Sequence, residues 1–339
     1  MKIILDAMGG DNAPEAVVLG ALDAAKDFNT EIILVGRGED ILDAMKKNGV
    51  SDLPAGVAIA HADDVVDMHD DPAAVLHKRK NSSMVVGLKM LAEGQGDAFV
   101  SAGSTGALLT AATLVVKRVK GIRRAAMAPA FPNKTGGKTI ICDCGANAEC
   151  TPEFLLQFAI VGSLHAKKTL GIANPRVGLL NIGTEDSKGT KLQLETYPLL
   201  VDACEKGLIN FIGNVEAGSV PYGACDVLVT DGFAGNVLLK SMEGMSKFLM
   251  LNLKETLTSS PKNKIAGLLC KKDVYAMKKK YDASEYGGAP LLGISAPVIK
   301  AHGNSDAHGM KNAILQAAKL VDGKTVEKIK EALAAVAEA

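Results

Sequence analysis

The sequence contains no tryptophan, and aromatic residues make up only 4% of it. Its 38 lysines and arginines are balanced by 38 aspartates and glutamates, so the formal net charge is zero. A neutral chain has no overall field that attracts nucleic acid, and basic stripes interleaved with aromatic residues are also missing. These absences argue against a nucleic-acid partner, and an acidic partner would have to bind a local basic patch.

Long hydrophobic runs are missing too. The longest helix-like runs, near residues 108–116 and 155–164, fall short of the ~20 residues that a membrane span needs. The first six residues, MKIILD, predict a strand and lack the basic, apolar and small-residue regions of a signal peptide. We therefore expect a cytoplasmic protein.

The six cysteines are scattered along the chain, which favours reduced thiols over a disulfide framework. Cys142 and Cys144 flank Asp143 in a predicted strand, whose alternation would place both thiols on one face. Cys150 lies nearby, but no fourth ligand is evident, so we expect no metal site.

The usual cofactor and nucleophile motifs are also missing. The chain lacks the full G-x-G-x-x-G of a dinucleotide site, the G-x-x-x-x-G-K-[ST] of a triphosphate loop and the G-x-S-x-G elbow. Local sequence places no histidine where it could activate a serine or cysteine. We therefore expect no cofactor.

What is present is a repeated strand, glycine-containing turn and helix. The clearest copy spans residues 227–240, where VLVT is followed by Asp231 and by glycines at 232 and 235 that open a helix. Glycines let the backbone approach a ligand, and the free N–H groups of a first helical turn favour an anion. The alternative is an ordinary turn in which Asp231 caps the helix.

Similar polar turns follow other predicted strands, at residues 6–11, 101–107, 143–147, 181–190 and 301–305. Alternating strands and helices predict a parallel α/β fold, as one large domain or two smaller ones. Because such sheets bind ligands outside the carboxyl ends of their strands, we expect the turns to converge on one edge and bind a small oxyanion. Ser104 and Thr105 are either phosphate ligands or ordinary caps. Lys188 either reaches the crevice or is merely solvated.

A helical hairpin is predicted after the turn at residues 231–236. Helix is expected from Val237 to about Thr258, with a break at residues 259–261 and a second arm to about Tyr281. Near the tip, Ile265, Leu268 and Leu269 share one face, flanked by lysines. Such a basic amphipathic face suits a membrane surface, a dimer partner or an acidic protein.

Together, six segments resemble the bacterial phosphate acyltransferase family of phospholipid synthesis. They are residues 6–11, 101–107, 181–189, 231–236, 284–293 and 300–303, in the family's order and across essentially the whole chain. The resemblance implies a three-layer α/β/α fold of the isocitrate/isopropylmalate-dehydrogenase type, with a mostly parallel sheet, as a single domain over residues 1–339 with the hairpin at 238–283. It also implies a homodimer that associates peripherally with the cytoplasmic membrane.

The implied reaction transfers a fatty acyl group from an acyl carrier protein thioester to inorganic phosphate. The acyl phosphate product would feed phosphatidic acid synthesis through a downstream glycerol-3-phosphate acyltransferase, which we expect as a partner. Phosphate can attack directly, so the enzyme mainly positions it and stabilises the oxyanion on the thioester carbonyl.

Residue roles follow from that reaction. We expect Lys188 to neutralise phosphate or oxyanion charge, Asp231 to orient or deprotonate the nucleophile, and His302 to assist the departing thiolate. The expected phosphate and substrate contacts are Gly103, Ser104, Thr105, Gly106, Asn147, Asn181, Gly183, Thr184, Gly235, Asn236 and Lys300.

An acidic carrier protein needs a basic patch, and two clusters qualify. They are Lys117, Arg118, Lys120, Arg123 and Arg124, and Lys271 with Lys272. Three other readings remain open: a short-chain phosphate acyltransferase acting on a coenzyme A thioester, a nicotinamide-dependent decarboxylating dehydrogenase, whose metal-binding carboxylates are not evident, and a non-catalytic membrane scaffold.

Overall fold

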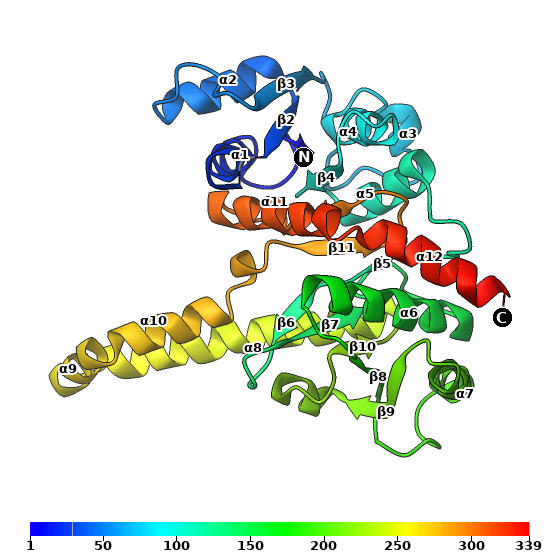
Figure 1. The fold of residues 1–339 in the computed structure, drawn as a ribbon. Helices are drawn as coiled ribbons and strands as arrows, with labels where there is room; N and C mark the ends of the chain where they lie inside the picture. The colour runs from blue at the N-terminus through cyan, green and yellow to red at the C-terminus, as the bar shows by residue number, and fades with distance from the viewer. Residues whose placement is uncertain (29, 339) are drawn as a thin grey trace.

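A computed structural model describes residues 1–28 and 30–338 (Figure 1). Its strands form two sheets instead of the one that was expected. The first sheet has the order β3-β2-β1-β4-β12-β11-β5. Its strands are β1 Lys2–Asp6, β2 Glu31–Gly36, β3 Val57–His61, β4 Ala98–Ser101, β5 Ala126–Met127, β11 Ala289–Leu292 and β12 Val298–Lys300.

The second sheet has the order β6-β7-β10-β8-β9. Its strands are β6 Ala130–Pro132, β7 Lys138–Cys142, β8 Arg176–Asn181, β9 Asn210–Glu216 and β10 Val227–Val229. The neighbours of β10, β7 and β8, both run parallel to it. Among the named strands of the described residues, only the pairs β11–β12, β11–β5 and β6–β7 are antiparallel, so both sheets are mostly parallel.

Helices cover both faces of the first sheet, because its strands alternate between two cores. Ile3 and Leu5 of β1 pack with α1 (Glu15–Phe28), α2 (Gly38–Lys47) and α11 (Ala307–Asp322). Ile4 faces the opposite way, toward α4 (Ser83–Ala92) and α5 (Thr105–Ala111). The short α3 spans Val75–Lys78. These contacts produce the expected three layers.

The second sheet repeats this arrangement. Val227 and Val229 of β10 pack with α6 (Pro152–Thr169), α7 (Lys191–Glu205) and α12 (Thr325–Glu338). Leu228 faces a smaller cluster that α8 (Gly232–Thr258) partly covers. Hydrogen bonds from Met127 N to Asp143 Oδ1 (2.8 Å) and from Asn147 Nδ2 to the Ala125 carbonyl (2.8 Å) join the two sheets.

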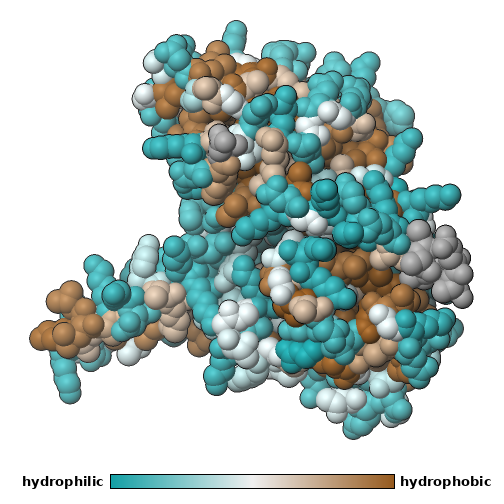
Figure 2. All heavy atoms as spheres, in the orientation of Figure 1, coloured by the Kyte–Doolittle hydropathy of each residue, from teal (hydrophilic) through white to brown (hydrophobic). Residues whose placement is uncertain are grey.

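The protruding hairpin differs in detail from its prediction. Its first arm is the long α8 (Gly232–Thr258), which begins directly after β10. The second arm is two helices, α9 (Pro261–Leu269) and α10 (Lys271–Lys280), because the chain leaves helical geometry at Cys270. The hairpin extends away from both sheets (Figure 1), and its tip is an apolar cap in the space-filling view (Figure 2).

One smaller expectation is also corrected. Cys142 and Cys144 do not share a face, because β7 ends at Cys142 and Cys144 packs in a separate cluster with Leu239. Within the described residues, no helix is long and apolar enough to cross a membrane.

Candidate functional site

Three neighbouring parallel strands of the first sheet end in polar residues at one edge. They are β1, which ends at Asp6, β4, which ends at Ser101, and β12, which ends at Lys300. The turns that follow them meet, since Asp11 N donates to the Gly303 carbonyl at 2.8 Å. The expected convergence therefore holds for these strands.

Asp6 is fully buried at the centre of this edge. Its carboxylate accepts hydrogen bonds from Ser83 Oγ at 2.5 Å and Ser101 Oγ at 2.7 Å. Burial raises the pKa of Asp6, and the two hydroxyl donors oppose that rise. Ser101 Oγ also accepts from Gly103 N at 3.0 Å, so this network fixes the turn that leads into α5.

Lys300 is the buried cation of the site. Its Nζ donates to the carbonyl oxygens of Ala102, at 3.3 Å, and Ala301. Burial lowers the pKa of Lys300 to about 8, against the opposing charges of Asp6 and Asp11. Lys300 therefore remains mostly charged at neutral pH and can accept an anion.

His302 lies just beyond Lys300 and is connected to α8. Its Nε2 is 3.5 Å from Glu243 Oε1, and Glu243 Oε2 accepts from Lys240 Nζ at 2.8 Å. Burial lowers the pKa of His302, while the Glu243 carboxylate opposes that shift. The imidazole therefore favours its neutral form and is held beside a carboxylate.

The Gly103 to Gly106 turn places Ser104 at the N-cap of α5. Ser104 is buried, yet its side chain makes no capping hydrogen bond. Thr105, half-buried, is the first residue of the helix. The cap interpretation of Ser104 is thus not supported, which leaves its hydroxyl available to a ligand.

At the second sheet, Asp143 organises the turn after β7. Its two oxygens accept from four backbone N–H groups, those of Met127, Cys144, Ala146 and Asn147. Asn147 Nδ2 donates both to Asp143 (2.9 Å) and to the Ala125 carbonyl. These contacts occupy the amide donors of Asn147. We therefore assign this residue a structural role in place of the expected phosphate contact.

The residues from Asp231 to Asn236 also cap α8 and pack against the turn after β7. Asp231 is the N-cap of α8, and its Oδ1 accepts from Ala234 N at 2.8 Å, which confirms that it caps the helix. Its role toward a ligand stays a prediction. Gly232 N donates to the Asn147 carbonyl at 2.7 Å and Gly235 N to the Asp231 carbonyl at 3.0 Å.

The glycines of this stretch are needed by the chain itself. A Cβ at Gly235 would overlap the Asp143 carbonyl oxygen, and one at Gly232 would lie 2.6 Å from the Asn147 carbonyl oxygen. The backbone that approaches them is the turn after β7, so the expected phosphate contact of Gly235 is corrected. Asn236 is exposed beside Gly145.

Lys188 lies in the exposed loop after β8. Asn181 shapes this loop, because its Nδ2 donates to the Lys188 carbonyl (3.0 Å) and its Oδ1 accepts from Ile182 N (2.8 Å). Gly183 packs against the Lys188 stem, whereas Thr184 is exposed. β8 is next to β10, so Lys188 and Asp231 follow neighbouring strands at one edge.

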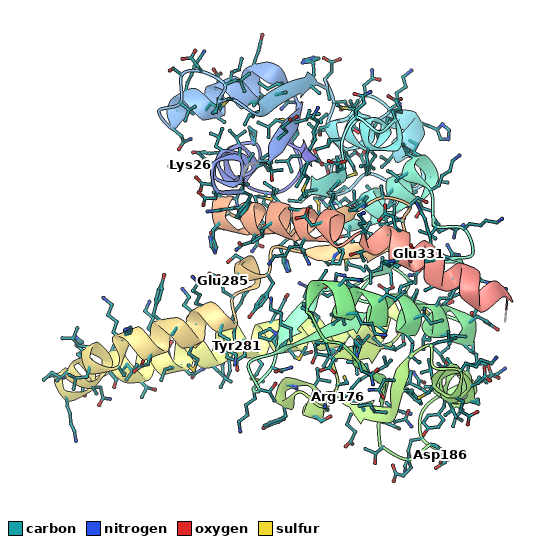
Figure 3. All side chains as sticks on the ribbon, viewed as in Figure 1. Lys26, Arg176, Asp186, Tyr281, Glu285 and Glu331 are labelled. Atoms are coloured by element: carbon teal, nitrogen blue, oxygen red, sulfur yellow. The ribbon has the colours of Figure 1, made fainter. Side chains whose placement is uncertain are left out.

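The predicted residues therefore form two groups on two sheets. Gly103 to Gly106, Lys300 and His302 belong to the first, and Asn147, Asn181 to Lys188 and Asp231 to Asn236 to the second. Figure 3 shows Asp186, in the Lys188 loop, well apart from Tyr281 and Glu285 at the base of the hairpin.

Four charged residues of the site were not among the expected contacts. Lys240 and Glu243 lie within a long helix. Glu243 pairs with Lys240 and lies against His302 from a different part of the chain, so no local motif marks them. The sequence does mark Asp6 and Asp143, since each is a carboxylate next to an otherwise apolar strand. Among the described residues, no three His, Cys, Asp or Glu side chains are grouped to hold a metal ion.

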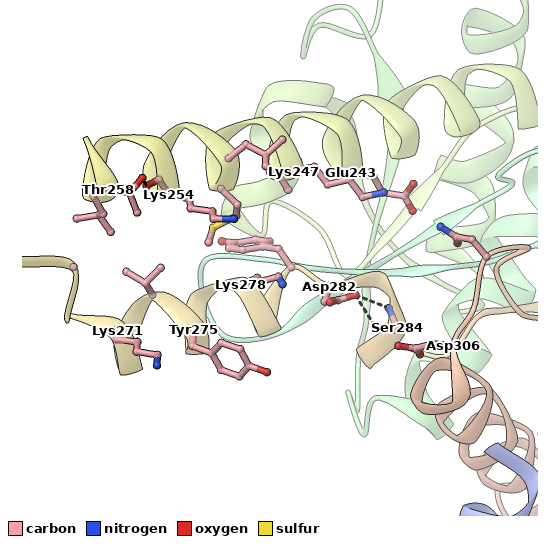
Figure 4. Close-up of a pocket in the computed structure, with 18 of the residues that line it drawn as sticks. Glu243, Lys247, Lys254, Thr258, Lys271, Tyr275, Lys278, Asp282, Ser284 and Asp306 are labelled. Atoms are coloured by element: carbon pink, nitrogen blue, oxygen red, sulfur yellow. Dashed lines mark hydrogen bonds between the residues drawn. The ribbon is translucent and has the colours of Figure 1, made fainter. Parts of the chain in front are cut away.

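A groove begins beside His302 and runs between the arms of the hairpin (Figure 4). Its volume is about 1150 Å³, slightly above the ~300–1,000 Å³ range of small-molecule sites. Apolar side chains and lysines from α8, α9 and α10 line it.

Comparison with known proteins gives consistent matches along the chain. Residues 1–328 match the model of a family described as "Fatty acid synthesis protein". The chain is 46% identical over 333 residues to the phosphate acyltransferase of Brevibacillus brevis, with 98% of this chain and 97% of the relative covered. It is 45% identical over 331 residues to that of Clostridioides difficile, with 98% and 96% covered.

Solved structures resemble the fold at much lower identity. A phosphotransacetylase from Streptococcus pyogenes has a TM-score of 0.63 at 19% identity, with 96% of this chain and 94% of that chain covered. A 4-hydroxythreonine-4-phosphate dehydrogenase from Klebsiella pneumoniae has a TM-score of 0.51 at 10% identity, with 95% and 98% covered. These likenesses confirm the expected α/β fold class and carry no information about substrates.

Proposed function

Because this chain belongs to the phosphate acyltransferase family, we propose that it transfers a fatty acyl group from an acyl carrier protein thioester to inorganic phosphate. The acyl phosphate would be consumed in phospholipid synthesis. The observation that carries the proposal is 46% identity over almost the full length of a phosphate acyltransferase. The buried cation and free hydroxyl at the first-sheet edge are consistent with an anionic substrate there.

The proposed chemistry is a direct displacement. A phosphate oxygen attacks the thioester carbonyl carbon, the carbonyl oxygen becomes a tetrahedral oxyanion, and the C–S bond then breaks. The carrier leaves as a thiolate, which takes up a proton. Fixed donors and cations aimed at the oxyanion accelerate such a step because they need no reorganisation during the reaction.

Phosphate binding is assigned first to the first-sheet edge. Lys300 supplies charge, while Ser104, Thr105 and the backbone of Gly103 and Gly106 supply donors. His302, whose Nε2 lies 3.5 Å from Glu243, would assist the departing thiolate. A neutral imidazole can donate an N–H hydrogen bond to the departing thiolate, which suits this role.

The second-sheet group is assigned to charge neutralisation and orientation. Lys188 would neutralise the phosphate or oxyanion, and Asp231 would orient or deprotonate phosphate. Gly183, Thr184 and Asn236 would add donors, with Asn181 positioning the Lys188 loop through its 3.0 Å hydrogen bond.

Two variants test the roles of the second-sheet residues. Asp231→Asn keeps a good N-cap acceptor and removes the charge, so a loss of turnover would report on the carboxylate and not on the fold. Lys188→Ala should lower kcat, whereas the matched control Lys191→Ala, in the exposed first turn of α7, should not. Near-normal turnover of both test variants at saturating substrate would refute these roles.

The carrier protein is proposed to bind a basic surface. Lys117, Arg118, Lys120, Arg123 and Arg124 are exposed, while Val119 and Ile122 between them are buried anchors. Lys271 and Lys272 lie near the hairpin tip. Figure 1 shows the segment after α5 and the tip on opposite sides of the molecule, so one small carrier would use only one of these clusters.

Charge reversal separates the two basic clusters. Arg123→Glu with Arg124→Glu, and Lys271→Glu with Lys272→Glu, are compared for the KM of acyl carrier protein at low and moderate salt. The cluster in use should show a raised KM and a weaker salt dependence. An unchanged KM for both pairs would contradict this docking proposal.

The hairpin tip is proposed to contact the cytoplasmic membrane peripherally, where the product is delivered to the glycerol-3-phosphate acyltransferase. Ile265, Leu268 and Leu269 are 64%, 73% and 82% exposed, an unusual degree for neighbouring aliphatic residues. Flotation with anionic liposomes should fall for Leu268→Glu and Leu269→Glu. Unchanged flotation would leave the tip as a packing element.

A homodimer is proposed through a different face of the hairpin. Phe233, Val237, Met245 and Phe248 form an exposed apolar stripe along α8, each at least 52% exposed. A second copy would cover this stripe. Phe248→Glu should shift the mass measured by light scattering from dimer to monomer, and a monomeric unsubstituted chain would contradict the assignment.

The central experiment mixes the purified chain with long-chain acyl carrier protein and phosphate. Freed carrier thiol and hydroxylamine-trapped acyl phosphate are measured together. Both should appear only when phosphate is present. Thiol release without phosphate would indicate a thioesterase, and preference for a coenzyme A thioester in competition would favour the short-chain alternative.

A further inference from the structure

The groove between the hairpin arms has an apolar interior that the proposed reaction does not yet use. Met250 and Leu257 line it from α8, Leu268 from α9, and Val274 and Tyr275 from α10. The arms approach closely toward the tip, where a Cβ added at Gly267 would lie 3.2 Å from the Cβ of Leu257. Figure 4 shows side chains of both arms facing one another across the open space between them.

One end of the groove opens at the candidate site. His302, Asn304 and Asp306, from the turn after β12, line it together with Lys240 and Glu243. Lys300 precedes the groove residue His302 by two positions, so the buried cation lies close to the groove mouth. A ligand in the groove can therefore place one end at the reacting centre.

The groove is long enough for a fatty acyl chain. Glu243 and Leu257 both line it, and their separation of fourteen positions corresponds to about 21 Å of helix at ~1.5 Å per residue. One acyl chain spans about half of the ~30 Å hydrocarbon core of a bilayer. A long chain thus fits between the site and the tip without leaving the groove.

The charged lining suits an amphiphile more than a protein helix. Lys247, Lys254, Lys271 and Lys278 line the groove beside its apolar residues. A lysine covers an apolar ligand with its methylene stem and keeps its ammonium group in water. The ammonium groups would also attract an acidic carrier or an anionic product.

This groove is separate from the surface assigned to the dimer. Four of the α8 residues that line the groove are Glu243, Lys247, Met250 and Lys254. Phe248 belongs instead to the exposed stripe. At ~100° per residue these sets occupy different faces of the helix. A second copy can therefore cover the stripe and leave the groove open.

We propose that the acyl chain of the thioester substrate lies between α8 and α10, with its carbonyl at His302 and its terminal methyl toward α9. The groove then sets the longest chain that the enzyme accepts and guides the product toward the tip. This inference rests on the proposed function, because that function supplies the acyl substrate.

The test obstructs the middle of the groove with Val274→Trp and uses Ala276→Trp, an exposed α10 residue outside the groove, as the matched control. The kcat/KM for a C16 thioester of the carrier should fall by about tenfold or more in Val274→Trp, because the displaced methylenes lose their apolar surroundings. A C8 thioester, which ends short of the obstruction, should be used as well by both variants as by the unsubstituted chain.

A binding measurement makes the test independent of turnover. The fluorescent fatty acid cis-parinaric acid should bind the unsubstituted chain and Ala276→Trp, and should bind Val274→Trp at least several-fold more weakly. Equal binding by all three, or equal use of C16 and C8 thioesters by Val274→Trp, would overturn the inference. An equal loss for both chain lengths with a changed oligomeric state would instead assign the groove to a second copy.

The two proposals fail differently. If the unsubstituted chain binds the fatty acid in the groove but transfers no acyl group to phosphate, the proposed function is wrong while the groove assignment stands. If transfer occurs and Val274→Trp leaves it unchanged at every chain length, only the groove assignment is wrong.

Discussion

Replacing Lys300 by methionine should change how stability depends on pH. Lys300 is 8% exposed, and its ammonium group is held by the carbonyls of Ala102 and Ala301. Its pKa falls from 10.5 to about 8 because burial disfavours the charge. At ~1.4 kcal/mol per pKa unit, that difference of about 2.5 means the charged lysine destabilises the fold by about 3 kcal/mol at pH 7.

The sign of the effect follows from proton binding. Between pH 8 and pH 10.5 the folded chain has released this proton while the unfolded chain still holds it. Stability contributed by this group therefore rises with pH in that window, and below pH 8 the penalty stays at its full value. From pH 7 to pH 9.5, the unsubstituted chain should gain about 2 kcal/mol relative to Lys300→Met.

The assay is urea unfolding followed by circular dichroism at the two pH values. Lys26→Met, at an exposed position on α1 (Figure 3), controls for the general effect of replacing lysine by methionine. A stability difference between the unsubstituted chain and Lys300→Met that stays constant within ~0.5 kcal/mol would falsify the reasoning.

The same variant tests substrate binding. Hydrogen bonds from a charged donor contribute ~1.5–3 kcal/mol, so Lys300→Met should raise the KM for phosphate by about tenfold or more at pH 7. Phosphate binding by the unsubstituted chain should weaken as the pH rises through 8, where Lys300 loses its charge. An unchanged KM in the variant would remove Lys300 from the phosphate site.

Two further predictions concern packing and thiol reactivity. Gly235→Ala places a methyl group against the Asp143 carbonyl and should destabilise the fold by about 3 kcal/mol. The control Gly244→Ala, at an open helical position, should stabilise the fold by up to ~1 kcal/mol. Equal unfolding midpoints for the two variants would show that α8 does not pack closely against that turn. Burial raises the pKa of Cys144 to about 12, so this thiol should not react with a disulfide reagent at pH 8 in the native chain, whereas the half-buried Cys270 should react. Labelling followed by peptide mapping measures both reactions. Early modification of Cys144 would contradict its burial.

Local features could be predicted because they depend on residues close together in sequence. The apolar runs before each turn form strands, Asp231 caps α8, and Ser82 caps α4 by accepting from Val85 N. These outcomes follow from side-chain alternation and from the free N–H groups at a helix start. The two arms of the hairpin follow from the helical pattern on either side of Pro261.

An exact position is harder to predict from sequence. Ser305 and Asp306 are adjacent candidates for the cap of α11, and the structure shows that Asp306 is the cap, because it accepts from Gly309 N at 2.8 Å. Adjacent polar residues compete for one cap, and the backbone path decides between them.

Only the tertiary structure decided how the turns are grouped. Strand β12 is inserted beside β4 from almost 200 residues away, as the 198-residue separation of Lys300 and Ala102 shows, and this brings a buried cation to the Asp6 edge. The same insertion sets His302 against Glu243 of α8 and opens the hairpin groove at that point. Sequence by itself determined the strands, helices, caps and polar turns. Their division between two sheets depends on the packing of distant segments, which local pattern does not encode.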